Sequence, residues 1–199
     1  MNKILIFAAI LIIIYSSIFF IPNRFEILSL NPEKISEIWR FITYPFTHLN
    51  TKHLIENIIG LSLVAFIARE LKTAFNDFSS TYLSSGFLSV IPIWLILSFT
   101  ALGASNAIFG GFGLITQNIK KFQIKSWYII VLLIIIIFLS SITNYFSYGS
   151  KSEQFVSSIK QNLAHFSGLI FGIGFFFFLS KIKPILTKRK RHVLRRLSE

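Results

Sequence analysis

Six apolar segments, separated by short polar stretches, account for most of this 199-residue chain. A helix needs roughly 20 predominantly apolar residues to cross the hydrocarbon core of a bilayer. Hydrophobic residues make up 53% of the chain and charged residues 14%, far from the balance of a water-soluble domain. The sequence therefore predicts an all-α polytopic membrane protein, with spans near residues 4–21, 53–68, 78–100, 105–119, 127–142 and 161–179.

The basic residues indicate how the domain is arranged. Eight of the twenty Lys and Arg residues lie after Ser180. We therefore expect one membrane domain at 1–182 and a basic cytoplasmic tail at 183–199 that contacts anionic lipid, not nucleic acid. Fourteen Lys and Arg residues fall on the side of the two termini and six on the other side, so the positive-inside rule places both termini in the cytoplasm. The absence of cysteine excludes disulfides and thiol nucleophiles.

Strongly polar residues within the predicted spans are few, and each is a functional candidate because an unpaired polar group in hydrocarbon is costly. His53, Asn57, Ser105 and His165 lie on three different spans. Measured back from the cytoplasmic end of each helix at about 1.5 Å per residue, all four lie roughly 18 to 24 Å deep. A single site in the outer half of the bilayer is the simplest explanation for this shared depth.

These side chains are the ones that acyl transfer requires. A hydroxyl can act as nucleophile, an imidazole as general base, and amide or imidazole N–H groups as donors to a developing oxyanion. Ser105 and His165 are the candidates for the first two roles. The only Asp, Asp77, is predicted near the cytoplasmic face, so we expect a Ser–His dyad without an acidic third member.

Four motifs follow one another along the predicted helices. They are Trp39-Arg40, then His48, His53 and Asn57 in an H-x4-H-x3-N pattern, then Gly103-Ala104-Ser105, and finally Ala164-His165-Phe166-Ser167-Gly168 with Gly172 one turn later. In this order they resemble the rhomboid family of intramembrane serine proteases, whose motifs are WR, H-x4-H-x3-N, GxSG and AHxxGxxxG. The resemblance implies a rhomboid-like bundle of six transmembrane helices.

The resemblance also assigns roles to residues. Ser105 is the expected nucleophile and His165 its base, and the Ser105 backbone amide with the His53 and Asn57 side chains is the expected oxyanion hole. Other residues have expected supporting roles. Phe109 packs on His165 where many relatives have Tyr, and Gly168 and Gly172 allow close helix packing. Gly103 precedes the nucleophile, and the first loop is stabilised by Trp39, Arg40 and His48.

Asn106 departs from the family pattern, which has Gly after the nucleophile. Its side chain is larger than that of glycine and has two donors and an acceptor. It could crowd the contact between helices, obstruct the path of the substrate or supply another donor to the oxyanion. Two functions therefore remain open: an endopeptidase that hydrolyses peptide bonds in or near transmembrane segments of membrane proteins, and a catalytically impaired relative that only binds such clients.

Other classes of function fit the sequence less well. A transporter or channel would have polar residues through the depth of the bundle, whereas here they gather in one layer. Metal binding by the histidines lacks the H-E-x-x-H pattern and carboxylate or thiolate ligands, so we expect neither a metal nor a cofactor. The resemblance favours an integral multi-pass protein of a prokaryotic cell membrane, with its site open to the extracytoplasmic side.

Overall fold

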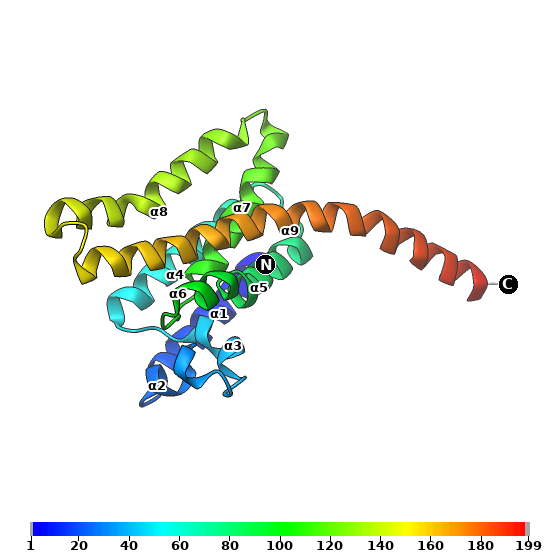
Figure 1. The fold of residues 1–199 in the computed structure, drawn as a ribbon. Coiled ribbons are helices and arrows are strands. Elements are labelled where there is room, and N and C mark those ends of the chain that lie inside the picture. The colour runs from blue at the N-terminus through cyan, green and yellow to red at the C-terminus, as the bar shows by residue number, and fades with distance from the viewer. Residues whose placement is uncertain (1, 198–199) are drawn as a thin grey trace.

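The computed structural model describes residues 2–197, apart from the side chains of residues 183 and 185–197. The expected lipid contacts of the tail at 183–199 thus lie almost wholly outside the described residues. The main helices are α1 (Lys3–Phe19), α4 (Thr51–Glu70), α5 (Phe75–Leu88), α6 (Ile91–Leu97), α7 (Ser105–Asn118), α8 (Ser126–Tyr148) and α9 (Glu153–Leu197). They form one bundle, from which the C-terminal part of α9 projects (Figure 1).

Four helical stretches among the described residues are long and apolar enough to cross a membrane. They are Thr51–Glu70, Phe75–Leu97, Ser126–Tyr148 and Glu153–Ile182. α1, with 17 residues, and α7, with 14, are shorter. All six lie where the sequence predicts a span, and the chain is a multi-pass integral membrane protein.

α7 lies at the centre of the bundle and contacts α4, α5, α8 and α9. Eleven of its 14 residues are buried. Its glycines and those of α9 leave no room for larger residues between the two helices: a Cβ at Gly168 would lie 2.5 Å from the Asn106 carbonyl oxygen, and one at Gly172 would overlap the Gly110 carbonyl oxygen. Small residues let helix backbones approach closely in membranes, and this contact sets the distance between α7 and α9.

The predicted span at 78–100 is two helices. α5 ends at Leu88, and α6 begins at Ile91 with Pro92 in its first turn. Proline has no N–H to donate and is tolerated in the first turn, where that N–H has no intrahelical partner. A linker of residues 98–104 follows and pairs with the earlier chain through an isolated antiparallel bridge between Leu30 and Ala101.

α8 and α9 both extend beyond the predicted spans toward the turn that joins them, where polar residues of the two helices hydrogen-bond to one another. The Asn162 amide donates to the Ser141 hydroxyl at 2.6 Å and to the Ser140 hydroxyl at 3.0 Å, and the Ser141 hydroxyl donates to that of Ser158 at 3.1 Å. The two helices run side by side into the short turn that joins them (Figure 1). These polar residues are thus interhelical contacts.

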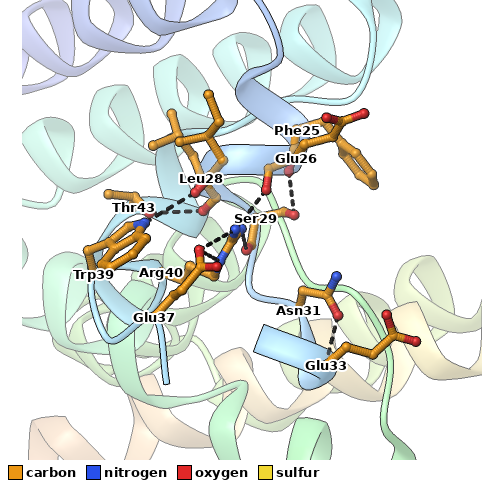
Figure 2. Close-up of polar contacts among 11 residues, drawn as sticks. Phe25, Glu26, Leu28, Ser29, Asn31, Glu33, Glu37, Trp39, Arg40 and Thr43 are labelled. Atoms are coloured by element: carbon orange, nitrogen blue, oxygen red, sulfur yellow. Dashed lines mark hydrogen bonds and ion pairs between the residues drawn. The ribbon is translucent and has the colours of Figure 1, made fainter. Parts of the chain in front are cut away.

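Residues 23–50 are a folded segment, not an extended loop. It contains α2 (Arg24–Leu28), α3 (Arg40–Thr43) and the 3-10 turns Pro32–Lys34 and Tyr44–Phe46. The Arg40 side chain is 2% exposed. It donates to the Glu26 carbonyl at 2.7 Å, to the Ser29 carbonyl at 2.8 Å and to the Glu37 carboxylate at 2.6 and 2.8 Å (Figure 2).

Trp39 supports the same segment from its surface. Its indole N–H donates to the Ile27 carbonyl at 3.2 Å, while about half of the side chain stays exposed. Thr43 adds a bond to the Leu28 carbonyl at 2.9 Å (Figure 2). The WR pair therefore connects α3 to the carbonyl groups of α2 and the residue that follows it.

Candidate active site

A cavity of about 460 Å³ lies between the starts of α4 and α7, the 98–104 linker and α9. Six of the residues singled out in the sequence line it: His53, Asn57, Ser105, Asn106, Phe109 and His165. They come from three helices that are well separated in the chain. The structure thus brings the candidate nucleophile, base and oxyanion donors to one cavity.

Ser105 is the first residue of α7. Gly103, two residues earlier, has a φ of +92°, which glycine adopts without strain. A Cβ at Gly103 would lie 2.6 Å from the His53 ring, and the Gly103 N–H donates to the Tyr44 carbonyl at 3.0 Å. The first N–H groups of a helix have no intrahelical acceptor and carry the positive end of its dipole, so the Ser105 amide is suited to bind an oxyanion.

His165 lies on α9 and is partly exposed to the cavity. Its ring stacks on that of Phe109, with centroids 5.1 Å apart and planes inclined by 24°. Among the described residues no hydrogen bond joins Ser105 and His165, although both line the cavity. Catalytic hydrogen bonds are often long in substrate-free enzymes and tighten in the complex.

His53 and Asn57 occupy the first turns of α4. Asn50 caps this helix, with its side-chain oxygen accepting from the His53 N–H at 2.9 Å. The Asn57 amide donates to the His53 carbonyl at 2.8 Å, four residues earlier. An amide nitrogen carries two hydrogens, so one Asn57 N–H remains for a ligand in the cavity.

Asn106 lines the cavity but bonds away from it. Its amide nitrogen donates to the Ser89 hydroxyl and to the Ala164 carbonyl, both at 3.0 Å. With both side-chain N–H groups used, the Asn106 amide has no donor left for an oxyanion. Ser89 was not singled out in the sequence, and an isolated serine in a predicted span carries no signal that would have identified it.

Six other residues singled out in the sequence do not line the cavity: Trp39, Arg40, His48, Gly103, Gly168 and Gly172. Trp39 and Arg40 belong to the folded segment described above, and Gly168 and Gly172 to the contact between α7 and α9. His48 is fully buried, with its ring centroid 5.2 Å from that of Tyr15 and 5.3 Å from that of His53. Burial, with a smaller contribution from His53, lowers the pKa of His48 to about 4.

A second cavity, of about 440 Å³, adjoins the first. Phe99, Thr100 and Gln161 line both cavities. The other residues of the second cavity are largely polar and come from the 98–104 linker and the beginning of α9; they include Lys151, Glu153 and Lys160. Within the part of the chain that the structure describes, no group of three His, Asp or Glu residues is arranged to hold a metal.

A family model described as "Rhomboid domain" matches residues 36–182, well over half of the chain. The matched region begins just before α3 and contains every residue that lines the first cavity. No curated protein matches the chain.

Proposed function

This chain belongs to the rhomboid family, and we propose that it is an intramembrane serine endopeptidase that hydrolyses peptide bonds in or near transmembrane segments of other membrane proteins. The observation that carries the proposal is the single cavity shared by Ser105, His165, His53 and Asn57. Proteases of this kind need a nucleophile, a base and preorganised donors within reach of one carbonyl group.

The reaction proceeds through an acyl-enzyme. The Ser105 hydroxyl attacks the carbonyl carbon of the scissile bond while His165 takes its proton. The oxyanion that forms accepts hydrogen bonds from the Ser105 amide and from the His53 and Asn57 side chains. His165 then gives the proton to the departing amine. A water molecule, deprotonated by His165, attacks the acyl carbonyl carbon, and His165 returns that proton to the Ser105 oxygen as the acyl group leaves as a carboxylic acid.

The bundle crosses the membrane six times, with both termini in the cytoplasm and the cavity in the outer half of the bilayer. This arrangement is supported by the distribution of Lys and Arg and by the positions of the six helices. The second, polar cavity supplies a path for water from the extracytoplasmic side. Substrates reach Ser105 laterally from the lipid of what we propose is a prokaryotic cell membrane.

The alternative is a relative that binds transmembrane clients without cutting them. Asn106, in place of glycine, is the feature that favours it. However, the Asn106 amide is bonded between helices, and a cavity remains in front of Ser105. These two facts support the endopeptidase over the client-binding protein.

Cleavage of a fluorogenic transmembrane peptide in liposomes tests the proposal. The purified protein should cut, and Ser105→Ala and His165→Ala should not. Ser62→Ala is the matched control, since the exposed Ser62 hydroxyl on α4 only bonds the Ile58 carbonyl of its own helix. Cutting by Ser105→Ala would refute the proposed nucleophile. A wild-type protein that binds varied peptides without cutting any of them would establish the client-binding alternative.

A further inference from the structure

We infer that Asn106 is a positioning residue for His165, because its amide holds the turn of α9 that carries His165 at a fixed distance from Ser105. The inference rests on the proposed function, in which the imidazole of His165 accepts the proton of Ser105. It assigns Asn106 a role that a glycine at this position cannot have, since glycine has no side chain to donate a hydrogen bond.

The first contact is made by the side chain. Asn106 is 5% exposed, and its amide donates to the carbonyl of Ala164, the residue directly before His165. The second N–H of the amide donates to Ser89, whose own hydroxyl donates to the Ser85 carbonyl at 2.7 Å. The amide is therefore fixed in orientation by α5 while it bonds α9.

The second contact is made by the backbone. Gly168, one turn after Ala164, packs against the carbonyl group of Asn106 so closely that a Cβ would lie 2.5 Å from its oxygen. Asn106 thus touches α9 on both sides of His165, at Ala164 through its side chain and at Gly168 through its main chain. Between these two points, Phe109 stacks on the His165 ring.

The contacts of Asn106 with α9 matter because the proposed Ser105–His165 dyad has no third member to orient His165. Among the described residues no carboxylate hydrogen-bonds to His165, so the position of its ring depends on the backbone of α9 and on Phe109. Ser105 and Asn106 are consecutive residues, and the nucleophile is therefore one peptide bond away from the side chain that holds the helix of the base. A shift of about 1 Å in a reacting group can lower a rate on the order of 100-fold.

Steady-state kinetics of peptide cleavage test the inference. Asn106→Ala removes the amide, and Asn106→Leu removes its donors while keeping a branched side chain of similar size. We expect both variants to lower kcat by about 10- to 100-fold and to change KM by less than about twofold. Ser89→Ala, which loses one of the two bonds, should lower kcat by a smaller factor.

Asn118→Ala is the matched control. Asn118 lies on the same helix, is 6% exposed and donates to the Thr73 hydroxyl at 3.3 Å, far along the chain from the cavity. Its loss should lower the unfolding temperature and leave kcat unchanged. If Asn106→Leu lowered the unfolding temperature with kcat unchanged, as expected of Asn118→Ala, Asn106 would have only a structural role and the inference would be overturned.

Imidazole NMR separates failure of the inference from failure of the proposed function. The chain has four histidines, so selective ¹⁵N-histidine labelling gives few signals to assign. We expect one sharp His165 signal in the wild type and in Asn118→Ala, and a broadened or split signal in Asn106→Leu. If the wild-type protein cuts nothing but the variants show this pattern, the proposed protease function is refuted while the role of Asn106 in positioning His165 stands. If the His165 signal is unchanged in Asn106→Leu, the inference is overturned.

Discussion

The ring of Phe109 lies against the ring of His165 in a stacked geometry, with centroids 5.1 Å apart. Phe109 lies one turn after Ser105 on the same helix. α7 therefore carries both the candidate nucleophile and the aromatic side chain that confines the candidate base. A hydroxyl on this ring is not needed for stacking. The substitution of Phe where many relatives have Tyr therefore preserves the packing of His165.

Removal of the Phe109 ring should lower activity through the orientation of His165. Aromatic pairs contribute about 0.5–1.5 kcal/mol beyond their area burial, so we expect Phe109→Ala to lower kcat about two- to tenfold and Phe109→Tyr to retain it. Phe175→Ala is the control, because Phe175 stacks on Phe171 at 5.7 Å elsewhere on α9. Cleavage assays in liposomes measure the effect, and equal losses in Phe109→Ala and Phe175→Ala would contradict a specific role.

The contact between α7 and α9 predicts opposite effects for two glycines of α9. A Cβ at Gly172 would overlap the Gly110 carbonyl oxygen, whereas one at Gly174 would meet nothing within 4 Å. Gly172→Ala should destabilise the protein by about 1–3 kcal/mol through overpacking. Gly174→Ala should be neutral or stabilising by up to about 1 kcal/mol, because alanine favours helix. Reversible unfolding in mixed micelles measures the free energy of unfolding of the two variants. Similar values for Gly172→Ala and Gly174→Ala would show that α7 and α9 can move apart without cost.

The buried Arg40 predicts a stability effect outside the cavity. Arg40→Ala leaves the Glu26 and Ser29 carbonyls and the Glu37 carboxylate without their donor, which should cost about 2 kcal/mol or more. Arg40→Lys should recover only part of this, because an ammonium group lacks the planar fork of guanidinium. Thermal unfolding measures the loss, with the exposed Lys34→Ala as control. A stability within about 0.5 kcal/mol of wild type would be evidence against this role of Arg40.

His48 predicts a loss of stability in mild acid. Its pKa is lowered to about 4 in the folded protein and lies near 6.5 in an unfolded chain. The neutral form is therefore favoured by folding, and its contribution is fully present above about pH 6.5 and is lost as the pH falls toward 4. The total change is about 3 kcal/mol. Unfolding midpoints at pH 7 and pH 5 should differ less in His48→Phe than in wild type, and an equal difference would exclude His48 as the cause.

The sequence predicted the positions of the main helices and six of the residues that line the cavity, because both depend on local patterns. Apolar runs identify spans, and the depth of Ser105 and His165 follows from counting residues along a helix. The partners of Asn106 could not be predicted in this way. Ser89 and Ala164 are 17 and 58 residues distant in the chain, and their contact depends on how three helices cross.

The helix ends were predicted less well than their centres, for a physical reason. Ser158 lies between the predicted spans at 127–142 and 161–179, where an unpaired polar group suggests a loop because such groups avoid hydrocarbon. In the structure Ser158 is buried on α9, where its hydroxyl accepts a hydrogen bond from Ser141 of α8, and Ser141 also accepts from Asn162. The Trp39-Arg40 motif predicted that Arg40 stabilises the segment at 23–50. Its acceptors could not be predicted, because they include backbone carbonyls, which every residue has.

α7 is the shortest of the six main helical stretches, with 14 residues and a rise of about 21 Å, whereas a hydrocarbon core is about 30 Å thick. Lys120 and Lys121 follow its C-terminal end, and in the proposed arrangement they hold that end at the cytoplasmic surface of the membrane. The number of residues in α7, and not the thickness of the lipid, then determines how far Ser105 lies from that surface. In a thicker bilayer the same protein would meet its substrate at a point farther from the opposite surface, so the lipid composition would select which peptide bond is cut.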